Sequence, residues 1–387
     1  MRKALFLSHV PPFPEVGGDR LRIAQSLRLL AELCHVDVAF ISHDRKEWSL
    51  KPYVHNIGKE YCFYASRARR YGRALRTVFN RRPEVVNHFL DRRLRCFVES
   101  VADDYDFVFC ASPVMAQYAF KAKFKGKVLD MTDSMTMNYC QAALVARGLG
   151  RLWYESESRR MRRYEARCAG EFDNVAYISE LDMDYLPGGS KCVVGNAVAA
   201  VDSADCCRYT PTSFNIVFVG KMNYEPNVRA AVFFATEVFP QVRDIVPQSR
   251  FYIVGSNPLP EIKTLAGIEG VEVTGFVPSV HPYYADAALV VAPMLSGSGI
   301  QNKILEALAH GCCVLTSPKG FEGIERLDDV LTVVGPYAGK WVDATAALLT
   351  DRAKARALGE AAAVRVMEEF GKDKIREEFR NFLSPVL

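Results

Sequence analysis

Short apolar runs alternate with helical patterns through the second half of the chain, and this alternation constrains the fold more than any other feature. The runs are strand-length and rich in β-branched residues, and they cover residues 214–220, 250–256, 271–276, 288–293 and 312–317. The segments between them, such as "EPNVRAAVFFATEVFPQV" and "IQNKILEALAHG", have the apolar spacing of helices. Strands that are apolar along their whole length are typical of a parallel sheet with helices on both faces. The second half is therefore predicted to be a Rossmann-like α/β domain.

The first half alternates in the same way, though less regularly. Its predicted strands are "ALFLSHV", "VDVAFIS", "YDFVFCAS", "KVLDMT" and "NVAYIS". The first run is short and lacks a small-residue cleavage site, so we expect a buried first strand and not a signal peptide. At 387 residues the chain is long enough for two domains. A small, polar stretch at 195–213 has no periodicity, which places the domains at 1–205 and 206–370.

Composition excludes several classes of protein. No apolar stretch approaches the ~20 residues that are needed to span a bilayer. The 11 cysteines are irregularly spaced with no CxxC pair, which indicates reduced thiols in the cytoplasm and not disulfides or a zinc site. The 7 histidines lack the spacing of metal ligands, and no GxSxG, HExxH or P-loop string occurs. We therefore expect neither a metal nor another cofactor.

Positive charge is concentrated in the first half. Residues 1–200 contain 31 Lys and Arg against 23 Asp and Glu, whereas residues 201–387 contain 18 against 22. The excess lies mainly in residues 67–95, which hold 10 arginines and 2 acids. Such a stretch attracts anionic partners, which could be membrane headgroups, lipid phosphates or nucleic acid, and a solvated helix face is the alternative. The expected cationic flank consists of Arg67, Arg69, Arg70, Arg73 and Arg76, with Ala68, Tyr71, Leu75, Val78 and Phe79 among them.

A glycine-containing loop precedes a helix in the segment "APMLSGSGIQNKILEALAHGCCVLTS", residues 292–317. Gly297 and Gly299 leave room for a phosphate to approach the amides at the positive end of the helix. Lys303 and Glu306 are three residues apart and share one helix face. There Lys suits a diphosphate and Glu suits the diol of a ribose. An exposed Lys–Glu pair on an ordinary amphipathic helix is the alternative, and these residues alone leave both open.

This loop and helix resemble the nucleotide-sugar site of glycosyltransferase family 4, the retaining transferases of GT-B architecture. Four further motifs follow the order of the family: "FVGKMNYEPNVRAAVFF", "FYIVGSNP", "VEVTGFVPSVHPYYADAALVVAP" and "SPKGFEGI". The string "GIQNKILEALAHG" is most similar to sugar transferases of bacterial exopolysaccharide clusters, including those associated with exosortases. The family has a glutamate eight residues before the position of Glu306, and this chain has Ser298 there.

The resemblance implies roles for individual residues. Lys221, Lys303 and Glu306 would be the catalytic set, in which the lysines bind the donor diphosphate and the glutamate holds the ribose. The donor-binding positions would be Gly17, Gly18, Asp19, Gly220, Phe276, Val277, Gly299, Ile300 and Gln301. Weaker candidates in the first half are Asp133, Ser179 and Glu180. Ser112 and Pro113 stand where many relatives have a histidine that contacts the donor sugar.

The resemblance also implies an architecture and an activity. Two Rossmann-like domains would face each other across a cleft, and the amphipathic segment 371–387 would pack back on the first domain. The activity would be the transfer of a sugar, with retention, from a nucleoside diphosphate sugar to a lipid-linked or other glycan acceptor in cell-surface polysaccharide synthesis. The protein would be cytoplasmic and peripheral at the inner face of the cytoplasmic membrane, with no nucleic-acid partner.

Two other functions stay open on the sequence. A nucleotide-sugar epimerase could use the same fold without an acceptor, although it needs carboxylate and histidine groups that the motifs do not supply. A non-catalytic nucleotide-sugar-binding protein would explain why the first glutamate and the strand-end histidine are absent.

Overall fold

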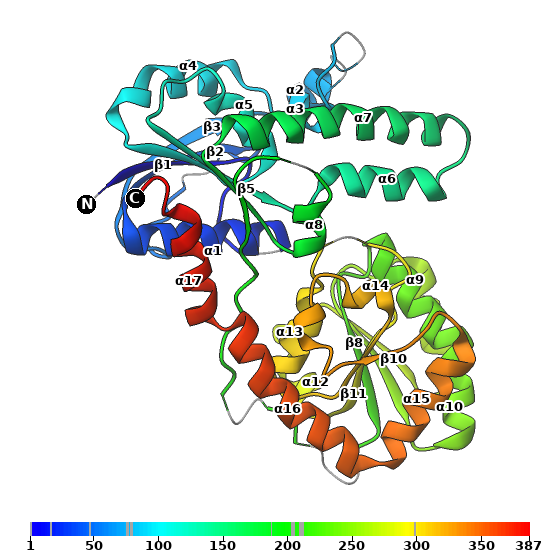
Figure 1. The fold of residues 1–387 in the computed structure, drawn as a ribbon. Coiled ribbons are helices and arrows are strands. Elements are labelled where there is room, and N and C mark those ends of the chain that lie inside the picture. The colour runs from blue at the N-terminus through cyan, green and yellow to red at the C-terminus, as the bar shows by residue number, and fades with distance from the viewer. Residues whose placement is uncertain are drawn as a thin grey trace. The chain divides into compact units, whose positions relative to one another are not determined.

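The chain folds into two compact units, which are described separately. The structure is a computed structural model, and it describes residues 2–15, 18–45, 48–74, 77, 80–186, 188–202, 206–208, 213–297 and 299–387. Unit 1 comprises Met1–Asn196 and Ile375–Leu387, and unit 2 comprises Ala197–Lys374 (Figure 1). The chain first passes from unit 1 to unit 2 after Asn196, nine residues before the boundary at 205 that the sequence predicted. It returns to unit 1 within the last helix.

Unit 1 is built on a seven-stranded sheet in which every neighbouring pair is parallel. The strand order is β3-β2-β1-β4-β5-β6-β7, so the chain first moves outward from β1 on one side and then from β4 on the other. The strands are β1 (Lys3–Ser8), β2 (His35–Ser42), β3 (Ile57–Tyr64), β4 (Phe107–Cys110), β5 (Gly126–Thr132), β6 (Asn174–Tyr177) and β7 (Lys191–Val193). The expected buried first strand is thus a central strand of the sheet.

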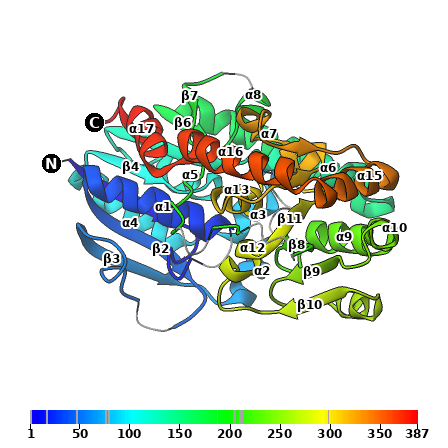
Figure 2. The same cartoon turned by 90° about the horizontal axis from the view of Figure 1, so that it is seen from below.

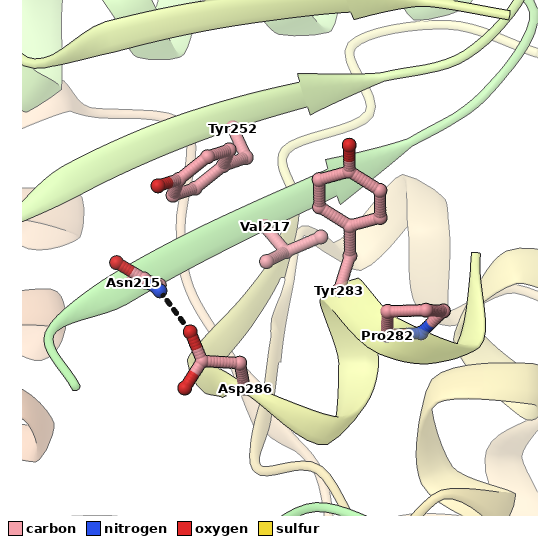
Figure 3. Close-up of a pocket in the computed structure, with 6 residues that line it drawn as sticks. All are labelled: Asn215, Val217, Tyr252, Pro282, Tyr283 and Asp286. Atoms are coloured by element: carbon pink, nitrogen blue, oxygen red, sulfur yellow. Dashed lines mark hydrogen bonds between the residues drawn. The ribbon is translucent and has the colours of Figure 1, made fainter. Parts of the chain in front are cut away.

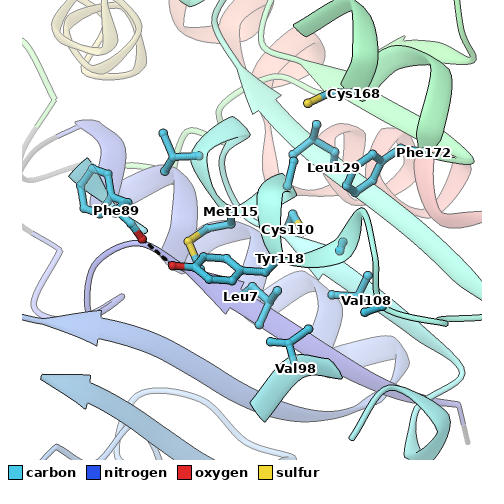
Figure 4. Close-up of a cluster of buried hydrophobic side chains, with 14 of the residues drawn as sticks. Leu7, Phe89, Val98, Val108, Cys110, Met115, Tyr118, Leu129, Cys168 and Phe172 are labelled. Carbon is cyan, nitrogen blue, oxygen red and sulfur yellow. Dashed lines mark hydrogen bonds between the residues drawn. The ribbon is translucent and has the colours of Figure 1, made fainter. Parts of the chain in front are cut away.

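Helices cover both faces of this sheet, as the wholly apolar strands require. They are α1 (Gly18–Leu33), α2 (Arg67–Ala74), α3 (Glu84–His88), α4 (Arg92–Val101), α5 (Pro113–Ala119), α6 (Met135–Val145), α7 (Gly148–Glu171), α8 (Glu180–Asp184) and, from the end of the chain, α17 (Lys372–Leu383). Alternate strand residues such as Leu7, Val108 and Leu129 form one face, which packs against Met115, Cys168 and other residues of α4, α5 and α7 (Figure 4).

The last helix completes the opposite face of the sheet. Phe6 and Phe109 stack on that face with ring centroids 5.2 Å apart, and Phe109 lies 5.8 Å from the ring of Phe379 and 6.0 Å from that of Phe382. Helix α17 lies beside α1 in both views (Figure 1, Figure 2), where Arg376 donates to Glu32 at 2.8 Å. Without α17, the aromatic face of β4 would be exposed to water, so this segment is part of the core of unit 1.

Unit 2 is built on a six-stranded parallel sheet of order β10-β9-β8-β11-β12-β13. Its strands are β8 (Asn215–Val219), β9 (Arg250–Val254), β10 (Val271–Gly275), β11 (Ala287–Ala292), β12 (Val314–Thr316) and β13 (Thr332–Val333). Its helices are α9 (Glu225–Phe233), α10 (Phe239–Ile245), α11 (Pro260–Thr264), α12 (His281–Ala285), α13 (Asn302–Ala309), α14 (Pro318–Phe321), α15 (Ala338–Thr350) and α16 (Arg352–Phe370). The predicted α/β fold with two parallel sheets is confirmed.

A buried ion pair fastens the end of the first crossing to unit 1. The guanidinium of Arg22 on α1 donates to both oxygens of Asp130 on β5, at 2.8 and 3.1 Å. It also donates to the main-chain oxygens of Val194 and Gly195, each at 2.7 Å. The amide of Gly195 donates in turn to Glu378 of α17 at 3.1 Å. Arg22 therefore helps to satisfy two buried carbonyls, of which that of Gly195 also accepts from Gln25 at 3.0 Å.

The arginine-rich stretch is only partly described. The described residues do not include Leu75, Arg76, Val78 and Phe79, nor the side chains of Arg67 and Arg69. Of the rest, Arg70 donates to His88 at 3.0 Å and lies over the ring of Phe89, while Arg73 donates to Asp91 at 3.0 Å. These two arginines are held by contacts within unit 1. Within the described ranges, no helix is long and apolar enough to cross a bilayer.

The Arg22–Asp130 pair gives a first prediction. Replacing Arg22 with Met leaves a buried carboxylate without its counter-charge, and we expect a loss of about 3–5 kcal/mol in the stability of unit 1. Glu32→Gln is the matched control, since it removes an exposed pair with Arg376 and should cost less than ~1 kcal/mol. Urea unfolding, followed by hydrogen–deuterium exchange of peptides from β1 and β5, measures both. Equal losses in the two variants would contradict this account of the buried pair.

Candidate functional site

The predicted loops of unit 2 lie at the carboxyl edge of its sheet, where the strand order reverses. The chain runs outward from β8 on one side and from β11 on the other, and the crevice between such strands is where open α/β sheets bind ligands. Gly220 and Lys221 follow β8, and residues 293–301 follow β11. The fold therefore brings two loops together that are more than 70 residues apart in the sequence.

Lys303 and Lys221 are connected by one buried side chain, Asn227. The ammonium group of Lys303 donates to Oδ1 of Asn227, and the amide group Nδ2 of Asn227 donates to the main-chain oxygen of Lys221 at 3.1 Å. Asn227 lies in the first turn of α9 and is only 5% exposed. Its two ends thus fix the position of the ammonium on α13 and the path of the loop after β8.

The close approach of Asn227 explains the glycine before Lys221. A Cβ atom at Gly220 would lie 2.6 Å from Nδ2 of Asn227, which is shorter than atoms tolerate. On the neighbouring strand, a Cβ at Gly255 would lie 1.7 Å from the main-chain oxygen of Gly220. A side chain at Gly220 would push the loop and Asn227 apart, and one at Gly255 would displace the main chain of Gly220.

Lys303 is half-buried, and its ammonium group is directed into the protein. Its Nζ lies 3.5 Å from Sδ of Met294 and 4.9 Å from the centre of the Phe218 ring, and burial lowers its pKa to about 7. Lys303 and Glu306 are both fully described, and their side chains do not pair with each other. The alternative of an exposed Lys–Glu pair is therefore wrong, because α13 directs the lysine into the protein.

Glu306 lies in a separate, half-buried environment one turn further along α13. The hydroxyl of Tyr284 is 3.4 Å from its Oε2, and burial raises the pKa of this carboxyl group, an effect that the nearby His281 and the tyrosine partly offset. Its main-chain oxygen lies 2.7 Å from Nδ1 of His310. The carboxylate is thus positioned by α12 and α13 together and can accept hydrogen bonds from a diol.

The loop before α13 depends on backbone conformations that glycine adopts readily. Gly297 and Gly299 have φ angles of 120° and 68°, and Ser298 between them lies outside the described residues. The side chain of Ile300 is buried, and the side-chain amide of Gln301 donates to the main-chain oxygen of Gly299 at 3.2 Å. These contacts hold the loop at the start of α13, where main-chain amides have no partner within the helix.

Phe276 and Val277 lie further along the same edge. They follow β10, an edge strand that is separated from β8 by β9. Phe276 is 77% exposed and comes directly after Gly275, whose φ angle is 70°. The fold places this exposed ring on the same edge as the lysines but two strands away from Lys221.

The candidates of unit 1 follow its own reversal of strand order, between β1 and β4. Gly18 and Asp19 are exposed at the start of α1, directly after the β1 loop, and Gly17 lies outside the described residues. Ser112 begins α5 after β4, and its hydroxyl is buried without a hydrogen-bond partner.

The three weaker candidates are explained by local structure. Ser179 caps α8 by accepting from the amide of Asp182, and Asp133 accepts from Asn138 at 2.8 Å. Glu180 is exposed in the first turn of α8. These contacts are what the ends of helices require and do not by themselves indicate catalysis.

A small pocket elsewhere in unit 2 is not part of this arrangement. It measures about 160 Å³ and is lined by Asn215, Val217, Tyr252, Pro282, Tyr283 and Asp286 (Figure 3). Asn215 donates to Asp286 at 2.7 Å, and these residues lie at the amino ends of β8 and β11. The glycine loops are at the opposite edge of the sheet. Within the described ranges, no group of three or more His, Cys, Asp or Glu side chains is placed to hold a metal.

Most of unit 2 matches a model of a known protein family. Residues 213–351 match the family model described as "Glycosyl transferases group 1". A Klebsiella pneumoniae protein named "Uncharacterized 44.6 kDa protein in cps region" is 22% identical over 340 residues, which cover 84% of each chain. The lysines, Asn227 and Glu306 all lie within the segment that matches the family model.

Solved structures share the fold over the whole chain. HepE of Anabaena, in complex with UDP and glucose, has a TM-score of 0.67 at 14% identity and covers all of both chains. TarM of S. aureus has a TM-score of 0.71 at 11% identity, covering 99% of this chain and 98% of that one. The lipopolysaccharide outer core galactosyltransferase WaaB has a TM-score of 0.64 at 13% identity over both full lengths. The chain has the GT-B fold, and the resemblance to glycosyltransferases is confirmed.

The sequence analysis missed Asn227. A single asparagine in the first turn of a helix has the pattern of a capping residue, and nothing in the string "NYEPN" marks it as buried. Its position six residues after Lys221 was the one available signal. The ammonium group that contacts it comes from Lys303 of α13.

Burial of Lys303 predicts a pH dependence of stability. The pKa of Lys303 is about 7 in the folded protein against 10.5 as its ordinary value. Between these values the unfolded chain binds a proton that the folded chain releases, so unit 2 should become more stable as the pH rises through this window. Lys303→Met should remove this slope.

Urea unfolding followed by the fluorescence of Trp341 measures the effect in unit 2, with Trp48 and Trp153 replaced by Phe. The comparison is the change in stability between about pH 7 and pH 10 with and without Lys303. Lys340→Met, which removes an exposed lysine on α15, is the control and should keep the slope of the parent. The same slope in the Lys303→Met protein would contradict the assignment.

Proposed function

We propose that this protein transfers a sugar from a nucleoside diphosphate sugar to a glycan acceptor. The observation that carries the proposal is the buried contact of Asn227 with Lys303 and with the Lys221 loop, at the strand-order reversal of unit 2. Burial disfavours the charged form of Lys303 and so costs stability, and such a cost is typical of a group that is kept for ligand binding. The contact lies in the segment that matches the glycosyltransferase model.

The proposed chemistry needs a site for a leaving diphosphate. The bond between the anomeric carbon and the diphosphate oxygen breaks, and a bond from that carbon to the acceptor oxygen forms. The acceptor's proton passes to the departing diphosphate oxygen. The ammonium groups of Lys221 and Lys303, together with the amides at the start of α13, would stabilise the charge that develops on the diphosphate. Glu306 would hold the ribose diol and so fix the donor.

The finer features of the proposal come from resemblance and from the relatives. HepE binds UDP, so uridine is the first base to test. The name of the Klebsiella protein places it in a cps region, which supports a role in cell-surface polysaccharide synthesis with a lipid-linked acceptor. We further propose retention of the anomeric configuration, no metal requirement, and a cytoplasmic protein that is peripheral at the membrane.

The donor site is tested by removing its charged groups. Lys303→Ala and Glu306→Ala should each lower turnover of the donor about ten- to a hundredfold, since a lost charge-assisted contact costs roughly 1.5–3 kcal/mol. Lys340→Ala and Glu360→Ala remove exposed charges on α15 and α16 and are the matched controls. The readout is the release of nucleoside diphosphate from a panel of nucleotide sugars, with thermal unfolding as the check on folding.

Unchanged donor kinetics in both site variants would refute the assignment. The same assay separates the other functions. Donor that is epimerised without an acceptor would indicate an epimerase, and donor that binds without any release of nucleoside diphosphate would indicate a binding protein. Turnover that persists in the presence of EDTA is expected, and its loss would contradict the proposed independence of a metal.

Binding of the nucleotide should take up a proton. At about pH 8 Lys303 is largely neutral in the free protein, and a bound diphosphate favours its charged form. Calorimetric titration with UDP, in two buffers of different ionisation enthalpy, should show an uptake that disappears in Lys303→Met. Equal uptake in both proteins would place the proton on another group.

A further inference from the structure

Five large apolar side chains are exposed together at the tip of one helical hairpin in unit 1. Leu144 and Val145 end α6 and are 82% and 71% exposed, and Leu149, in the first turn of α7, is 86% exposed. Leu152 and Trp153 follow on the same helix and are also exposed. Single exposed apolar residues are ordinary on a protein surface, but a contiguous group of this kind marks an interaction site.

The hairpin is held firmly at its base. The hydroxyl of Thr136 donates to the buried carboxyl of Glu165 at 2.6 Å, and Ser134 donates to the same group at 3.3 Å. Further along, Sγ of Cys140 lies 2.9 Å from the hydroxyl of Ser158. Helices α6 and α7 lie side by side and extend away from the strands of unit 1 (Figure 1). The 11 residues of α6 carry the tip about 16 Å beyond this base.

Charge favours an anionic partner for the tip. Residues 134–154 contain no Asp, Glu or Lys, and their two charged residues, Arg147 and Arg151, are both exposed. Arg151 pairs with Glu155, the next charged residue of α7, at 2.8 Å, which leaves Arg147 as the cation nearest the tip. The next exposed charges along α7 include the arginines Arg159, Arg162 and Arg163. Leucines and a tryptophan at the extremity, with arginines beside and behind them, have the arrangement of segments that enter the headgroup layer of a bilayer.

We propose that the tip of the α6–α7 hairpin inserts into the surface of an anionic lipid bilayer. The apolar side chains would enter the boundary of headgroups and acyl chains, and Arg147 and Arg151 would contact lipid phosphates. This deepens the proposed function, because a lipid-linked acceptor is presented at such a surface. The biological role of membrane binding rests on the proposed sugar transfer. The binding of the hairpin tip to a bilayer needs neither the donor nor the acceptor and can be tested separately.

Flotation of the full-length protein with vesicles tests the proposal. We expect binding to mixed phosphatidylglycerol–phosphatidylcholine vesicles and at least tenfold weaker binding in Leu149→Ser/Leu152→Ser. The matched control is Ile245→Ser/Val364→Ser, which removes two exposed apolar side chains from unit 2 and should change binding less than twofold. Arg147→Gln/Arg151→Gln should lose the preference over vesicles of phosphatidylcholine alone, and high salt should do the same.

Trp153 is a direct reporter of insertion. Its fluorescence should shift to shorter wavelength with anionic vesicles, and the shift should be absent in Trp153→Phe. Equal flotation of the parent and the Leu149→Ser/Leu152→Ser protein would overturn the proposal. It would also be overturned if the parent ignored vesicles and the same variant converted a dimer to a monomer on gel filtration. Release of nucleoside diphosphate from soluble donor is measured in parallel, so that failure of membrane binding is distinguishable from failure of sugar transfer.

Discussion

Both sheets of this protein are parallel throughout, and a parallel sheet has to be buried on both faces because its connections place helices there. Because all strands of a sheet run in the same direction, the loops that follow them lie at one edge. Loops from distant parts of the sequence therefore meet at the carboxyl ends of the strands. In unit 2 this brings the loop after β8 beside the loop after β11. In unit 1 the last helix of the chain packs against the aromatic face of β4.

Two polar contacts then fix the positions of segments beyond the sheets. Arg22 binds Asp130 and the carbonyls at the end of the first crossing, and its charge is balanced within the fold. Lys303 differs, because its ammonium group is held by the neutral amide of Asn227 and burial lowers its pKa. The pair of arginine and carboxylate stabilises the fold. A lysine that contacts only a neutral amide has no counter-charge there, and binding of an anion would favour its protonated form. The difference lies in the partner of each cation.

Much of this arrangement could be predicted from the sequence. The apolar runs indicated the strands. The glycine-containing loop drew attention to Gly299, Lys303 and Glu306, and the family resemblance added Gly220 and Lys221 as candidates. The amphipathic pattern of residues 371–387 indicated a closing helix. Asn227 was missed, since its role depends on contacts with residues on two other elements. The apolar tip of the α6–α7 hairpin was missed too, because the exposure of Leu149 and Leu152 cannot be told from burial by their spacing alone. The sequence indicated the basic stretch at 67–95 as the membrane-binding segment instead. In the structure, Arg70 and Arg73 of that stretch donate to side chains of unit 1.

The sequence by itself determined the class of fold, the glycine-containing loops and the family that they resemble, because these depend on local periodicity and on short motifs. Only the tertiary structure decided that Lys303 points into the protein, that the amide of Asn227, 76 residues earlier in the chain, connects it with the loop after β8, and that the hairpin exposes its leucines. The physical reason is the same in each case. The burial of a side chain, and its pKa and exposure with it, depend on which distant segments pack together. A short stretch of sequence does not specify those contacts.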